Sequence, residues 1–444
     1  MALEKLGRNT AVLTVSALVM RLTGMLWQVW LAGQIGAAGI GLFQLVMSVG
    51  FLFVTVAVSG IRFTVTRLLS EELGLGREGS VDAVVGRAGV YALVFGFLAM
   101  AGLYFGAEQI ARSWIGGGRT VLSLRLLALG LPAGGVSSLL GGYFTAVGRV
   151  WKTATEQFVE QLVRMVLSAA ALRWAAGREL GLVCAAVVGA GTAADIAGGL
   201  AMLTLFAFDR RRYARSPVRG GALTARMLKL AFPLALSAYA RSALGTFRQM
   251  LVPRGLRLSG LDGEAALAGY GVINGMAMPV LTFLTCLPAA VAELLVPELT
   301  ALQVRGETAR LRATAERLLR LTLGFSLAAG AFFFVTADAL GALIYRSAES
   351  AKYIRLFAPM VPLIYTDIVT DGCLKGLGQM MRSMAYNVAE AALGLVLVWL
   401  LLPGWGLAGY SFVLYVCEVF NFVLSLHRLR VVTGCRVLPL GRDK

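Results

Sequence analysis

Long apolar segments follow one another along almost the whole chain, separated by short polar stretches. A helix needs about 20 mostly apolar residues to cross the roughly 30 Å hydrocarbon core of a bilayer. Lipid offers the backbone no hydrogen-bond partner, so each segment of this length is expected to be a helix, and the short alternating segments of a membrane β-barrel are absent. The sequence therefore predicts an all-α polytopic membrane protein with twelve spans: 10–33, 39–65, 84–106, 121–146, 154–175, 181–207, 223–249, 267–299, 314–337, 354–377, 383–402 and 405–427.

Composition and charge agree with a protein of the cytoplasmic membrane. The hydrophobic share is 58% and the mean hydropathy is +0.76, against about 45–50% apolar residues in soluble domains. The net charge of +17 comes from basic residues in short loops, which is typical of the positive-inside bias and unlike a nucleic-acid-binding patch. Most of them fall on the side of the two termini, which predicts that both termini are cytoplasmic.

Two stretches in opposite halves of the chain share one pattern. "RLLALGLPAGG" begins at Arg125 and "RLFAPMVPLIY" at Arg355, and each contains a proline and is followed by two glycines at the same spacings. The matched residues are Pro132 and Pro362, Gly142 and Gly372, and Gly148 and Gly378. Proline inside a helix removes a backbone donor and bends the helix, so Pro132 and Pro362 are either static bends or hinges.

Further matches extend this pattern over both halves. Ser16, Ala17, Gly24 and Gln28 recur at one common offset as Ser237, Ala238, Gly245 and Gln249. An even number of helices in each half gives both halves the same orientation in the membrane, and such repeats place a substrate path at their interface. We expect a six-helix lobe over residues 1–209, a basic cytoplasmic linker over 210–229 and a second six-helix lobe over 230–444. Two similar lobes indicate an alternating-access transporter that acts as a monomer.

Arginines inside apolar segments are the candidate substrate-binding residues. Charges in a membrane are costly and usually face a cavity. Arg21 and Arg241 lie in the first helix of each predicted lobe, and Gln28 lies seven residues after Arg21 on the same helical face. A guanidinium is always charged and presents a rigid fork of donors that suits phosphate. Arg62, Arg164 and Arg248 are further candidates.

Acidic residues inside the segments are the candidates for ion coupling. Asp367 and Asp371 are spaced i, i+4, so their like charges favour protonation of one or a cation between them. Asp195 and Glu390 are further candidates, with Na⁺ or H⁺ as the possible coupling ion. Glu160 and Arg164 have the spacing and order of a favourable intrahelical ion pair.

Motifs of enzymes and of resident metal sites are missing. No phosphate-binding G-x-x-x-x-G-K-[ST] loop, H-E-x-x-H, Cys-x-x-Cys or G-x-S-x-G occurs, and the single histidine, His427, is isolated. We therefore expect no catalytic residues, no cofactor and no metal site.

Several stretches resemble the polysaccharide flippases related to stage V sporulation protein B, within the multidrug/oligosaccharidyl-lipid/polysaccharide exporter superfamily. They are "GAAGIGLFQ" at 36–44, "SG" at 59–60, "RLLSEE" at 67–72, "EQFVEQLVRMVL" at 156–167 and "LKGLGQMMRSMAYNVAEAALGLVLVWLLLPGWGLAGYS" at 374–411. The resemblance implies a MATE-like fold of two lobes and export of a polyprenyl-diphosphate-linked sugar, such as a peptidoglycan precursor, for the cell wall or spore cortex. Arg62 stands where the family usually has proline, and twelve spans are fewer than the fourteen common among these flippases.

Our hypothesis is a flippase of a lipid-linked oligosaccharide, with Arg21 and Arg241 holding the diphosphate. The alternative is a cation-coupled multidrug exporter, in which acidic residues would carry substrate recognition. A membrane glycosyltransferase would need catalytic carboxylates on sizeable extramembrane loops, whereas the longest loop here is basic. A scaffold without transport is disfavoured by the charges inside the spans.

Overall fold

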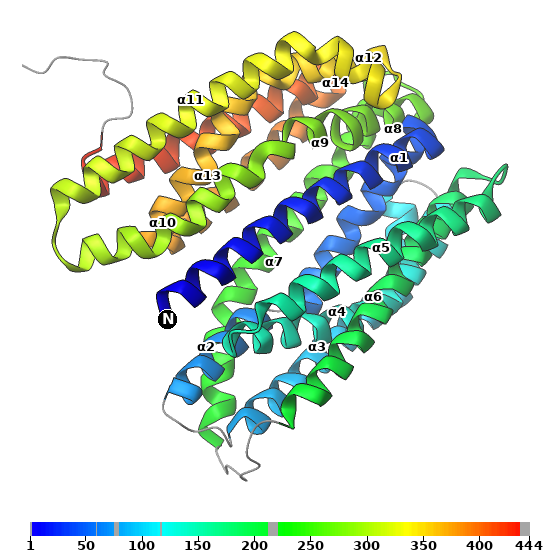
Figure 1. The fold of residues 1–444 in the computed structure, drawn as a ribbon. Helices are drawn as coiled ribbons and strands as arrows, with labels where there is room; N and C mark the ends of the chain where they lie inside the picture. Colours follow the sequence, from blue (N-terminus) through cyan, green and yellow to red (C-terminus); the bar gives the residue numbers. More distant parts are fainter. Residues whose placement is uncertain (1, 59, 75–79, 116–117, 212–220, 436–444) are drawn as a thin grey trace, which may run out of the picture. The chain divides into compact units, whose positions relative to one another are not determined.

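The computed structural model describes residues 2–58, 60–74, 80–115, 118–211 and 221–435 (Figure 1). These ranges are helical and contain no strand, which confirms the predicted all-α class. Short π and 3-10 turns join several helices. The α-helices are α1 (Ala2–Val58), α2 (Ile61–Gly74), α3 (Ser80–Ile110), α4 (Val121–Ala146), α5 (Val150–Ala175), α6 (Leu180–Arg210), α7 (Gly221–Leu258), α8 (Gly263–Gly271), α9 (Met278–Leu281), α10 (Cys286–Val304), α11 (Thr308–Leu340), α12 (Ala348–Phe357), α13 (Val361–Gly376) and α14 (Met380–Thr433).

Two of these helices are too long for a single crossing of a membrane. With a rise of about 1.5 Å per residue, 57 residues of α1 and 54 of α14 exceed 80 Å in contour length, against a core of about 30 Å. Each is interrupted by a glycine with non-helical backbone angles, Gly36 in α1 and Gly406 in α14. Gly36 falls between the predicted spans 10–33 and 39–65, and Gly406 is the second residue of the predicted span 405–427. Each long helix is therefore interrupted close to a predicted boundary between two spans.

By length and hydropathy, six helices among the described residues are suited to crossing a membrane, or seven if the bent pair 263–281 and 283–292 is one span. The protein is thus a polytopic membrane protein, and the count of twelve spans stays a prediction.

Contacts divide the chain into two compact units. The first contains residues 1–27 and 42–250, and the second contains residues 28–41 and 251–444. The predicted lobes, 1–209 and 230–444, differ from these units in the segments 28–41 and 230–250. The lobe boundaries remain a prediction, because contacts group segments that touch and do not show which segments move together. Of the predicted linker, α6 ends at Arg210, α7 begins at Gly221, and residues 212–220 lie outside the described ranges.

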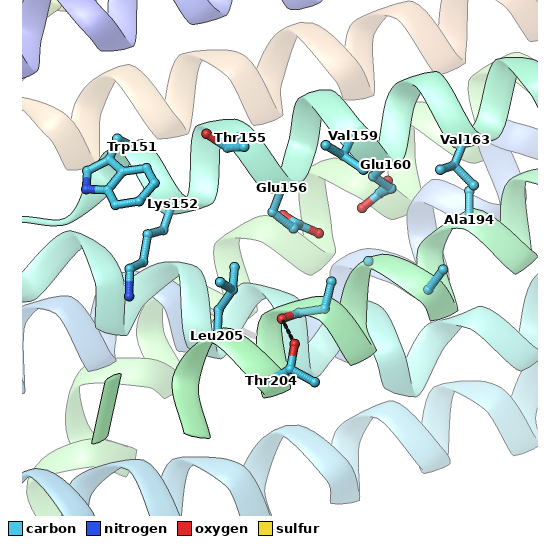
Figure 2. Close-up of a pocket in the computed structure, with 13 residues that line it drawn as sticks. Trp151, Lys152, Thr155, Glu156, Val159, Glu160, Val163, Ala194, Thr204 and Leu205 are labelled. Carbon is cyan, nitrogen blue, oxygen red and sulfur yellow. Dashed lines mark hydrogen bonds between the residues drawn. The ribbon is translucent and has the colours of Figure 1, made fainter. Parts of the chain in front are cut away.

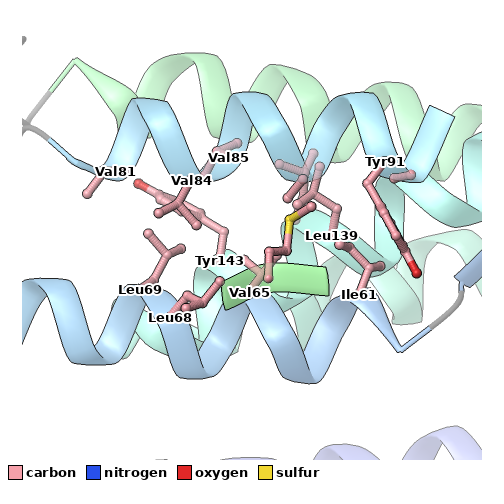
Figure 3. Close-up of a cluster of buried hydrophobic side chains, with 14 of the residues drawn as sticks. Ile61, Val65, Leu68, Leu69, Val81, Val84, Val85, Tyr91, Leu139 and Tyr143 are labelled. Carbon is pink, nitrogen blue, oxygen red and sulfur yellow. The ribbon is translucent and has the colours of Figure 1, made fainter. Parts of the chain in front are cut away.

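Each unit has its own apolar core. In the first unit, Val65 and Leu69 of α2 pack with Val84 of α3 and with Leu139 and Tyr143 of α4 (Figure 3). In the second unit, α10, α11, α13 and α14 share a core that includes Leu299, Leu319, Val369, Leu374 and Leu429. Because lipid surrounds the outer faces, these packed inner faces fix how the helices of a unit fit together.

The repeated sequence pattern produces the same local geometry in both units. Gly148 and Gly378 each end a helix with a positive φ, 70° and 69°, a conformation that glycine adopts without steric cost. The residue after each glycine donates a 2.8 Å hydrogen bond back into the helix, Arg149 to Phe144 and Gln379 to Leu374. The pattern therefore encodes a tight turn between two helices, α4 to α5 and α13 to α14.

The remaining repeated residues are points of close helix contact. A Cβ on Gly142 would lie 2.6 Å from the carbonyl oxygen of Arg62, and one on Gly372 would lie 2.6 Å from Cβ of Ala292. Pro132 likewise contacts Gly96 of α3, in the same way that Pro362 contacts Gly330 of α11. The glycines thus allow helices to approach closely, as small residues do in membrane bundles.

Replacing Gly142 by alanine is expected to destabilise the first unit, because the new methyl group would collide with backbone that has no rotamer to change. We expect a loss of about 1–3 kcal/mol, seen as a lower thermal unfolding midpoint in detergent. The matched control is Gly134→Ala on the same helix, where a Cβ meets nothing within 4 Å. An equal loss in both variants would contradict the close-contact explanation.

Candidate functional site

A cluster of charged side chains joins α5 to α6 in the first unit. Nη2 of Arg164 lies 2.6 Å from Oε1 of Glu160, which confirms the intrahelical pair predicted from the sequence. The same guanidinium group also pairs with Oδ1 of Asp195 on α6. The three side chains are 21–40% exposed. One arginine therefore neutralises two acidic groups from neighbouring helices, and the candidate residues Arg164 and Asp195 form one site.

This cluster borders a cavity of about 310 Å³ between α5 and α6 (Figure 2). Its walls are mostly apolar, with Val159, Val163, Ala197 and Leu205 among the lining residues, and its polar groups come largely from the α5 side. Small side chains on α6 leave the space open. The cavity is thus an apolar space with acidic groups at one wall, within a single unit.

Sequence reasoning did not single out Glu156, which also lines this cavity. Glu156 is only 7% exposed, and its Oε1 atom is buried without a hydrogen-bond partner among the described residues. The available signal was the spacing of Glu156, Glu160 and Arg164, which are four residues apart in turn and so lie along one face of α5.

The candidate residue Arg62 lies at the start of α2, close to this end of α5. A Cβ on Gly141 of α4 would lie 3.6 Å from Nε of Arg62 and 3.7 Å from Cγ2 of Thr153. Thr153 is one helical turn before Glu156. The guanidinium group of Arg62 therefore lies in the same region of the first unit as the acidic cluster.

In the second unit, the two aspartates of the predicted i, i+4 pair each have their own partners on α14. Nδ2 of Asn421 donates to Asp367 at 2.9 Å, and the hydroxyl of Ser383 donates to Asp371 at 2.8 Å. The second oxygen of Asp371 accepts a longer contact of 3.5 Å from Asn387. The pair is thus held by amide and hydroxyl donors that sequence reasoning did not name, although polar residues in an apolar segment are a readable signal.

Several polar atoms around Asp367 remain without a partner in the described part of the chain. They are Oδ1 of Asp367, Oδ1 of Asn421 and the hydroxyl of Ser425, all buried. Glu390 lies half-buried on the same α14. Buried polar atoms without partners are rare and often mark a bound ion or a functional group. No group of three or more metal-ligating His, Cys, Asp or Glu side chains occurs in the described part of the chain.

The remaining candidates for substrate binding lie on α1 and α7. Arg21 and Arg241 are exposed, and Arg248 is half-buried. In the first unit α7 packs on α1, where Thr246 donates to the backbone oxygen of Ser48 at 2.9 Å. Gln28, predicted on one face with Arg21, belongs to the second unit, where its Nε2 donates to the carbonyl oxygen of Gly275 at 3.2 Å.

Ionisable clusters inside the apolar helices of a polytopic membrane protein mark functional sites, and the family of the chain makes it a membrane flippase or exporter and not an enzyme. The chain belongs to the family "Polysaccharide biosynthesis protein", whose model matches residues 6–301, and the MatE family model matches residues 243–400.

The chain is also similar to individual known proteins. Stage V sporulation protein B of Bacillus subtilis (strain 168) is 24% identical over 99% of this chain and 86% of that protein. Lipid II flippase MurJ of the same organism is 29% identical over 37% of this chain and 31% of that protein. The fold matches an inward-facing multidrug resistance MATE family transporter of the MOP superfamily, with a TM-score of 0.71 and 16% identity over 94% of this chain and 96% of that one. A multi-pass protein of the cell membrane follows from these relationships.

Replacing Arg164 by glutamine is expected to lower the thermal unfolding midpoint in detergent, because two partly buried carboxylates would lose their shared cation. We expect a cost of about 1–3 kcal/mol. Adding Asp195→Asn should recover part of that loss, since one uncompensated charge is removed. The matched control is Arg173→Gln, which removes an exposed arginine from the same helix. No recovery in the double variant would argue against the bridge to Asp195.

Proposed function

We propose that the protein flips a polyprenyl-diphosphate-linked oligosaccharide or peptidoglycan precursor across the cytoplasmic membrane by alternating access. Membership of the polysaccharide biosynthesis family carries this proposal, because a polyprenyl-diphosphate-linked sugar would pair a long lipid with an anionic, sugar-bearing head group. One relative is a lipid II flippase and another a sporulation protein, which favours synthesis of the cell wall or the spore cortex.

Arginines would bind the diphosphate, since each guanidinium can form two charge-assisted hydrogen bonds to phosphate oxygens. Arg21 and Arg241 are the first candidates because their side chains are exposed. Arg62 and Arg248 are the second. Arg164 is bound by two carboxylates and would have to leave them to reach a phosphate. Gln28 would contribute to binding only if its amide group left the carbonyl oxygen of Gly275.

Coupling to an ion gradient would use the acidic groups inside the helices. The candidates are Asp367, Asp371 and Glu390 in the second unit and Asp195 in the first, with Na⁺ or H⁺ as the ion. Pro132 inside α4 and Pro362 in the first turn of α13 would serve as hinges when the lobes move. We further propose that both termini are cytoplasmic and that the protein acts as a monomer, with no nucleic-acid partner.

Loss of Arg21 and Arg241 tests the proposed binding site. Purified wild type and Arg21→Ala/Arg241→Ala would be mixed with an undecaprenyl-diphosphate-linked disaccharide-peptide, and binding measured by native mass spectrometry. A hydrogen bond to a charged group contributes about 1.5–3 kcal/mol, so the double variant should bind at least about tenfold more weakly. The control is Arg112→Ala/Arg310→Ala, which removes two positive charges at exposed positions.

The outcomes separate the two functions. Equal binding by the double variant and the wild type would contradict the arginine site. A protein that binds a lipophilic cation and not the lipid-linked sugar, with binding that depends on Asp367 or Asp371, would be a cation-coupled multidrug exporter. The MatE match and the fold of the solved transporters are the reasons to include a lipophilic cation in the binding measurement.

A further inference from the structure

The acidic wall of the cavity in the first unit contains more negative charge than its arginine can neutralise. Glu156 and Glu160 line it, and Arg164 pairs both with Glu160 and with Asp195 of α6. Three carboxylates beside the guanidinium of Arg164, with that of Arg62 beyond Thr153, would still leave uncompensated charge in an apolar surrounding, which is expensive. A bound positive charge or a proton would remove that cost.

Gly198 of α6 shows where the two glutamates meet. A Cβ on this residue would lie 2.7 Å from Oε1 of Glu156 and 2.7 Å from Oε2 of Glu160. Both oxygens therefore border the same small gap, which exists because position 198 has no side chain. Figure 2 shows both carboxyl groups directed from α5 toward α6.

The oxygen of Glu156 that faces this gap has no donor in the described structure. It is buried, and the residue as a whole is 7% exposed. Two ionised carboxylates only accept hydrogen bonds, so oxygens of two such groups can be joined only if one carries a proton. The other charged groups near Glu156 are Asp195 and Arg164, which are paired with each other, and Arg62 of α2, beyond Thr153. Lys152, which also lines the cavity, is engaged 2.6 Å from Asp209.

We propose that Glu156 and Glu160 form a proton-binding site above Gly198, in which one proton is shared between the two carboxyl groups. This inference rests on the proposed flippase function. It makes H⁺ an ion that the first unit binds and releases during transport. The proton reaches Glu156 through the cavity between α5 and α6, which this residue lines. It is released to water molecules when water enters that cavity. Glu156 then acts as the proton carrier and Arg164 as the residue that positions Glu160.

Infrared difference spectra between alkaline and acidic pH test the site without any substrate. The wild type in proteoliposomes should show the C=O stretching band of a buried protonated carboxylic acid, and Glu156→Gln should lose it. The control Glu108→Gln removes an exposed acid and should keep the band. A wild type whose spectrum equals that of Glu156→Gln would overturn the proposal.

Gly198→Ala provides a second variant that retains every carboxyl group. Its methyl group would occupy the gap and push the two oxygens apart, so we expect a weaker band at the same pH. Gly191→Ala on the same helix is the matched control, because a Cβ there meets nothing within 4 Å. A band that sodium chloride removes and potassium chloride does not would also overturn the proposal, since it would identify a Na⁺ site.

Transport measurements then separate this inference from the proposed function. Flipping of the lipid-linked disaccharide-peptide would be followed in proteoliposomes with and without an imposed pH gradient. We expect the pH gradient to increase the flipping rate of the wild type. The flipping rate of Glu156→Gln should be the same with and without the gradient. Flipping in both proteins with an equal response to the gradient would overturn the proton site alone. A wild type that shows the infrared band but does not flip would overturn the proposed function and leave the site intact.

Discussion

The cost of leaving a polar group in hydrocarbon without a partner governs this structure at every level. It first acts on the backbone, whose donors and acceptors must be satisfied within the spanning segments, and the described chain is accordingly helical. It then acts on the side chains, because each ionisable group placed in an apolar helix needs a partner, a cavity or a change of protonation. The requirement on the backbone explains the helical framework. The requirement on the side chains explains where the charged clusters lie within it.

The two units meet this requirement with different chemistry. In the first, a guanidinium group bridges carboxylates of α5 and α6, so charge is balanced by charge. In the second, Asp367 and Asp371 are held by neutral donors, the amide of Asn421 and the hydroxyl of Ser383. Neutral donors stabilise a carboxylate less than a cation does. The units thus share a repeated backbone and differ in electrostatics, which is expected if the two have separate tasks.

Helix packing in a membrane depends on small residues, since lipid gives little hydrophobic drive for helices to associate. Gly41 and Gly271 show this within the second unit, where a Cβ on either would lie 2.2 Å or less from a backbone oxygen of the other helix. Gly41 belongs to the "GAAGIGLFQ" stretch that carried the family resemblance. That resemblance therefore rests in part on a backbone contact. At Gly198 the absence of a side chain has a different effect, because it leaves a gap that two carboxyl groups border.

By itself the sequence determined the helical membrane class, the family, the repeated spacing that includes Gly148 and Gly378, and the pairing of Glu160 with Arg164. These features depend on segment length or on spacing within one helix, which the helical period of 3.6 residues fixes. Only the tertiary structure decided that Arg164 also reaches Asp195, that Asn421 holds Asp367, and that Glu156 lies against Gly198. Those contacts join different helices, and they depend on the rotation and spacing of each helix against its neighbours. Packing of many side chains sets that rotation, and a periodicity read along one segment does not contain it.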